Sequence, residues 1–123
     1  MKLALLVGTG SFVGGSLRYL LSQFVQGKSS TAFPFGTLTV NLTGCLLIGF
    51  LFGLSERINI PQEWRLFIAT GILGGFTTFS AFSNETVSLL RDGQFWTASV
   101  YVLSSVMLGL IATFTGIFIT KAF

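Results

Sequence analysis

Long apolar stretches separated by short polar interruptions run along the whole of this chain. The interruptions contain residues that commonly bound helices, such as Gly27 after the first stretch, Pro61 before the third and Gly93 after it. Each stretch reaches the roughly 20 apolar residues that a helix needs to cross a bilayer. The pattern predicts an all-α membrane protein with one domain over 1–123 and four transmembrane helices, at approximately 3–25, 36–55, 62–90 and 95–120.

The composition agrees with a membrane location and excludes several kinds of chemistry. Hydrophobic residues make up 51% of the 123 residues and charged residues 9%, with a mean hydropathy of +0.81, whereas a soluble domain is about 25% charged. The chain has no histidine and one cysteine, Cys45. It therefore has no histidine base, no Cys/His zinc cluster and no disulfide within the chain. The seven Lys and Arg residues are scattered, so nucleic acid is not an expected partner. We therefore expect neither an enzyme nor an organic cofactor, and we expect the lipid bilayer as the surroundings.

The charges give little information on orientation. With four crossings, Lys2, Arg57, Arg65 and Lys121 share one side of the membrane. Lys28 and Arg91 lie on the other side, and Arg18 is a further candidate for it. A difference this small is a weak signal under the positive-inside rule. Two arrangements remain open: one modestly preferred orientation, or both orientations in the same membrane, which would permit an antiparallel dimer.

Small residues and aromatic residues predict how the helices pack and where they end. Gly49 and Gly53 are four positions apart, and a similar stripe in the last stretch includes Gly116, so the backbones of these helices are expected to approach closely. Trp64, Trp96 and Tyr101 lie near the ends of segments, where amphipathic rings favour the headgroup layer.

The third stretch contains an unusual segment at its centre. Gly74-Gly75 and Thr77-Thr78 are poor residues for a helix interior, because glycine lowers helix propensity and threonine hydroxyls compete for backbone partners. Backbone groups released there cannot face lipid, so a break near 74–78 requires a protein-lined or aqueous cavity. Such broken helices often present carbonyl oxygens to cations and amides to anions. The alternative is a kinked helix that is fully packed.

Aromatic and polar residues close to this segment are candidates for contact with an ion. Phe79 and Phe82 share a helix face, and the electropositive edges of their rings suit a small anion, although a Phe pair also packs in ordinary cores. Further candidates are the polar residues at membrane depth, each of which is expensive there unless it is paired, hydrated or functional. They are Asn41, Ser105, Thr113, Arg18 and Glu85.

Three motifs together resemble the Fluc (CrcB) fluoride channels along the whole chain. They are Arg18-Tyr19 after a glycine-rich start, the segment 36–41 (GTLTVN), and the segment 74–85 (GGFTTFSAFSNE). The resemblance implies an antiparallel, dual-topology homodimer with two pores in a bacterial plasma or inner membrane. It also implies passive, fluoride-selective efflux from the cytoplasm, which would give fluoride resistance.

The resemblance also implies roles for individual residues. Phe79 and Phe82 would line the fluoride pathway, Asn41 would donate a hydrogen bond to it, and Ser105 and Thr113 would extend it along the last helix. The backbone carbonyls of Gly74 and Thr77 would hold a structural sodium ion at the centre of the dimer. Arg18 and Glu85 would shape the vestibules or form salt bridges.

One position departs from the family pattern, and two rival functions remain. Gly109 stands where a serine is common, so a polar track through this point would need water, a backbone group or another hydroxyl. A small proton-coupled multidrug exporter would also have four helices, but it would be expected to have an acidic residue in the first helix, which this chain lacks. A non-transporting membrane assembly subunit would explain the glycine stripes, but not the third stretch.

Overall fold

The protein is entirely helical, and the computed structural model describes all residues from Met1 to Phe123. Helix α1 covers Lys2–Gln26, α2 covers Phe35–Ser55 and α6 covers Phe95–Lys121. The third long segment, Gln62–Arg91, has four parts. They are α3 (Gln62–Arg65), a π-helical stretch η1 (Leu66–Leu73), a single turn α4 (Gly74–Phe76) and α5 (Phe79–Arg91).

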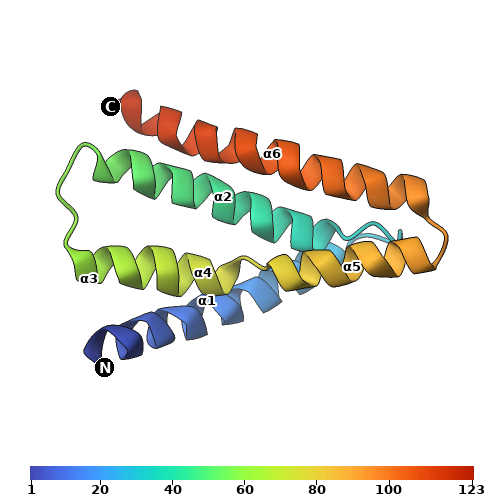
Figure 1. The fold of residues 1–123 in the computed structure, drawn as a ribbon, viewed down its shortest axis with the longest axis horizontal. Coiled ribbons are helices and arrows are strands. Elements are labelled where there is room, and N and C mark those ends of the chain that lie inside the picture. Colours follow the sequence, from blue (N-terminus) through green and yellow to red (C-terminus); the bar gives the residue numbers. More distant parts are fainter.

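Four helical segments are long and apolar enough to cross a membrane, which confirms the prediction of four spanning helices. Figure 1 shows them side by side, with both chain termini and the loop between α2 and α3 at the same end of the molecule. This arrangement is the one that four successive crossings produce.

The helices approach closely where glycines face another backbone, as the small-residue stripes predict. The most extensive packing is between α2 and α6, where a Cβ on Gly49 would collide with the carbonyl of Thr113 and one on Gly116 with the carbonyl of Leu46. On the other side of the bundle, a Cβ on Gly14 of α1 would collide with the carbonyl of Ile72 in η1. Close backbone approach supplies the van der Waals contact that holds helices together in lipid.

Only a small interior core is present. Six apolar residues are buried, of which Leu89, Ala98 and Tyr101 form one cluster, and many large apolar side chains on the outer faces of the bundle are exposed. Trp64 and Trp96 are also exposed, which suits a headgroup position. Tyr101 differs from these tryptophans, because its side chain is completely buried and packs with the rings of Phe33 and Phe82.

Candidate functional site

The third span loses helical geometry at Thr77 and Thr78. Thr77 has φ −85° and ψ 158°, and Thr78 has φ −150° and ψ 117°, so both are extended. Figure 1 shows this stretch as a thin connection between α4 and α5, midway along the span. Because lipid cannot satisfy the released peptide groups, other parts of the protein must bond to them.

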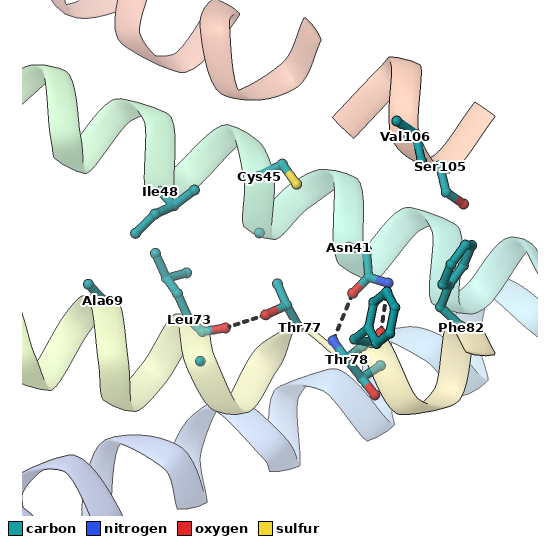
Figure 2. A pocket seen from close by; sticks show the side chains of 13 residues that line it. Asn41, Cys45, Ile48, Ala69, Leu73, Thr77, Thr78, Phe82, Ser105 and Val106 are labelled. Atoms are coloured by element: carbon teal, nitrogen blue, oxygen red, sulfur yellow. Dashed lines mark hydrogen bonds between the residues drawn. The ribbon is translucent and has the colours of Figure 1, made fainter. Parts of the chain in front are cut away.

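Asn41 of α2 bonds to both peptide groups of Thr78. Its Nδ2 donates to the Thr78 carbonyl at 3.0 Å, and its Oδ1 accepts from the Thr78 N–H at 2.8 Å. Figure 2 shows the amide reaching across from α2 to the extended segment. The Asn41 amide has a second N–H, which these two bonds leave available. Asn41 therefore supports the extended backbone and also retains one donor.

The same rearrangement releases carbonyls at the end of α4, among them those of Gly74 and Thr77. In a continuous helix, the N–H of Thr78 would donate to the Gly74 carbonyl, and the N–H of Ala81 to the Thr77 carbonyl. Instead, Thr78 donates to Asn41, and Ala81 donates to Thr78 Oγ1 at 3.1 Å. The carbonyls of Gly74 and Thr77 thus lack their usual helical donors.

The hydroxyl of Thr78 caps the start of α5. By accepting from Ala81 it satisfies one of the first amides of this 13-residue helix, while the amides of Phe79 and Ser80 have no intrahelical acceptor. A helix N-terminus carries a partial positive charge. The start of α5 therefore presents positive potential in the middle of the third span without a charged side chain.

A cavity of about 420 Å³ opens between α2, α6 and the third span (Figure 2). Seven of its 13 lining residues are hydrophobic, and none is charged. Six of the lining residues were predicted to act in ion contact, so the structure brings them together in one place. These are Asn41, Gly74, Thr77, Phe79, Phe82 and Ser105.

The two predicted phenylalanines differ in burial. Their ring centroids lie 5.7 Å apart at an interplanar angle of 46°. The Phe79 side chain is 79% exposed, whereas Phe82 is partly buried and packs against Tyr101 with centroids 5.1 Å apart. Phe82 is thus held by its neighbours, while Phe79 projects from the chain at the mouth of the cavity.

Thr113 and Arg18 lie outside this cavity. The Thr113 hydroxyl donates to the Gly109 carbonyl within α6 at 3.1 Å. Arg18 lines a separate cavity of about 250 Å³ with residues of α1, α2 and α5, and Thr78 borders both cavities. Glu85 accepts a 2.6 Å hydrogen bond from Thr37, which also borders the Arg18 cavity.

Sequence reasoning missed several residues at the site. Thr37 and Thr78 belong to the polar motifs, but nothing in their spacing predicts their partners. Nothing in the sequence indicates that the hydroxyl of Tyr101 is buried without a hydrogen-bond partner. Cys45 lies one turn after Asn41 on α2 and lines the larger cavity, and its i, i+4 relation to Asn41 was the available signal.

Comparisons with known proteins give a consistent result. The model of a family described as "CrcB-like protein, Camphor Resistance (CrcB)" matches residues 5–117. A protein of Chlorobium phaeobacteroides named "Fluoride-specific ion channel FluC" is 47% identical over 118 residues, covering 95% of this chain and 91% of its own. Proteins with the same name from Phocaeicola vulgatus and Flavobacterium psychrophilum are 42% and 43% identical. They cover 98% of this chain and 100% and 98% of their own lengths, respectively.

Proposed function

Because the chain belongs to the family of CrcB-like proteins, we propose that it is a fluoride-selective channel through which fluoride leaves the cytoplasm passively. The family consists of multi-pass membrane channels, not of enzymes. Relatives that align over nearly the full length bear the name of fluoride-specific channels, which supports fluoride as the conducted ion. Passive loss of fluoride down its electrochemical gradient would give the cell resistance to it.

The observation that carries this proposal is the uncharged cavity beside the extended segment. Fluoride is small and strongly hydrated, so it needs compensating contacts when it sheds water. The cavity offers the second N–H of Asn41, the hydroxyl of Ser105 and the ring edges of Phe79 and Phe82. Neutral donors and dipoles stabilise an anion without trapping it, which conduction requires.

Thr113, Arg18 and Glu85 have different roles in this proposal. Thr113 lies two turns beyond Ser105 on the same face of α6, so its contact with the ion would come after the cavity. Arg18 would attract anions into the vestibule that its cavity forms. Glu85 would shape that vestibule through its bond to Thr37.

We also propose that a structural sodium ion binds at the end of α4. The freed carbonyls of Gly74 and Thr77 are hard oxygen donors of the kind that suits such a cation. Two carbonyls are fewer oxygen ligands than a hard cation takes, so a second chain would contribute its own pair. The sodium ion would stabilise the extended segment, and the fluoride pathway would not pass through it.

A second copy of the chain is the partner that we propose, in an antiparallel, dual-topology dimer. The exposure of Phe79 supports this, because another subunit would have to complete the pathway wall around it. The weak charge bias between the two sides of the membrane permits both orientations. If a cysteine is added after Phe123 in a Cys45→Ser background, an impermeant maleimide should label about half of the chains in intact bacteria. Labelling of all chains or of none would contradict dual topology.

Fluoride efflux from proteoliposomes tests the function directly. Vesicles loaded with potassium fluoride receive valinomycin to balance charge, and an electrode follows external fluoride; a parallel set contains potassium chloride. We expect rapid fluoride release without ATP or a proton gradient, and little chloride release. Drug–proton exchange would favour the exporter, and the absence of any flux would favour an assembly subunit.

A further inference from the structure

The polar face of α6 is interrupted at Gly109, one turn beyond the cavity-lining Ser105. Ser105, Gly109 and Thr113 are each four positions apart and therefore lie on one helix face. Gly109 is buried and has no side chain, so between Ser105 and Thr113 the helix offers no side-chain donor over about 12 Å. The hydroxyl of Thr113 is directed to the Gly109 carbonyl, which leaves the gap unfilled from α6 itself.

The Cys45 thiol of α2 lies opposite this gap. If Gly109 had a Cβ, its nearest neighbour outside α6 would be the sulfur of Cys45, at 3.5 Å. Cys45 lines the cavity, is partly exposed and forms no disulfide. Figure 2 shows it one turn along α2 from Asn41, with no hydrogen bond to another lining residue. The thiol is therefore an uncommitted donor within the cavity.

We propose that the neutral Cys45 S–H donates a hydrogen bond to fluoride at the position where Gly109 provides no side chain. This inference rests on the proposed function. Asn41, Ser105 and Cys45 would then form a continuous set of neutral donors on the α2 and α6 sides of the cavity. A thiol is a weak donor. Because it is uncharged, it can donate to fluoride without trapping the ion.

The size of the cavity means that a weak donor is sufficient. Its volume of about 420 Å³ far exceeds the roughly 30 Å³ that one water occupies in the liquid, so fluoride would keep part of its hydration shell there. An apolar side chain at position 45 would leave the wall beside Gly109 without a polar group. The ion would then lose a compensating contact as it passes.

Four variants test the proposal in the fluoride efflux assay: Cys45→Ser, Cys45→Ala, Gly109→Ser and the double variant Cys45→Ala/Gly109→Ser. We expect Cys45→Ser to conduct at least as well as the wild type, and Cys45→Ala to conduct about 2- to 10-fold more slowly, the effect of losing one hydrogen bond. A Cβ at Gly109 would lie 3.5 Å from the Cys45 sulfur, in ordinary contact, and Cys45→Ala removes that sulfur and frees space for the serine hydroxyl. The double variant should therefore regain flux within about twofold of the wild type.

A labelling experiment provides an independent readout on the wild-type protein. Cys45 is the only cysteine, so methyl methanethiosulfonate reacts with it alone. We expect the reagent to reduce fluoride flux, reductant to restore it, and fluoride to slow the labelling more than chloride does. In the efflux assay, Gly8→Ser is the matched control for the hydroxyl that Gly109→Ser adds, because Gly8 has open space around it.

Several results would overturn the inference. One is a wild-type channel that conducts while Cys45→Ala conducts equally well. Another is a conducting Cys45→Ala/Gly109→Ser variant with no gain over Cys45→Ala, and a third is labelling that fluoride does not slow. A wild-type protein that conducts no fluoride would instead refute the proposed function.

Discussion

Replacing Asn41 with alanine should both destabilise the protein and stop fluoride conduction. The substitution removes the 3.0 Å bond to the Thr78 carbonyl and the 2.8 Å bond from the Thr78 N–H. Each buried polar group left without a partner costs about 1–3 kcal/mol. Because both bonds are only partly buried and Thr78 borders two cavities, the two groups together would cost about 2 kcal/mol, near the lower end of that range. This is still a sizeable part of the roughly 5–15 kcal/mol by which a domain is stable.

A return of the extended segment to helix would reduce this cost in stability, but it would alter the proposed pathway. If Thr77 and Thr78 became helical, the N–H of Thr78 could donate to the Gly74 carbonyl again. The third span would then straighten, the start of α5 would no longer present free amides, and Gly74 could not bind a cation. Either outcome removes part of the proposed pathway.

Thermal unfolding in detergent and fluoride efflux from proteoliposomes measure the two effects. We expect Asn41→Ala to lower the unfolding temperature by several degrees and to reduce flux at least about tenfold. Asn59→Ala is the control, because Asn59 lies exposed in the loop between α2 and α3. An Asn41→Ala protein with the unfolding temperature and flux of the wild type would refute the idea that this amide supports the extended segment.

Three further results are expected. Phe79→Ile and Phe82→Ile should each reduce fluoride flux at least about tenfold, because they remove the ring edges that contact the ion. Each should cost less than about 1.5 kcal/mol in stability, because the new side chain is also apolar. Wild-type flux in both variants would contradict the role of the rings. Gly49→Ala should destabilise the protein by about 1–3 kcal/mol in thermal unfolding, because its Cβ would collide with α6, whereas Gly8→Ala should not; equal unfolding temperatures would count against close backbone packing there. Dialysis of sodium against N-methylglucamine should lower the unfolding temperature and its return should restore it, whereas a temperature independent of sodium would argue against the cation site.

Hydropathy and spacing in the sequence predicted the four spanning helices, which the structure confirms. The spans could be predicted because bilayer thickness and helix rise set the length of each one, independently of the other segments. The glycine stripe of α2 likewise predicted close helix packing, and the structure shows that its partner is α6. The candidate residues Asn41, Phe82 and Ser105 were selected from polarity and helix face, and they now line one cavity.

The partners of these residues depended on the tertiary structure. Only the packing of the helices shows that Asn41 bonds to Thr78, that Tyr101 of α6 is completely buried, and that Cys45 of α2 faces Gly109 of α6. A hydrogen-bond donor is free or occupied according to what the neighbouring helix presents to it. Sequence periodicity describes one helix at a time, so it determined which groups reach the interior, and the packing of the helices decided which of them remain available to an ion.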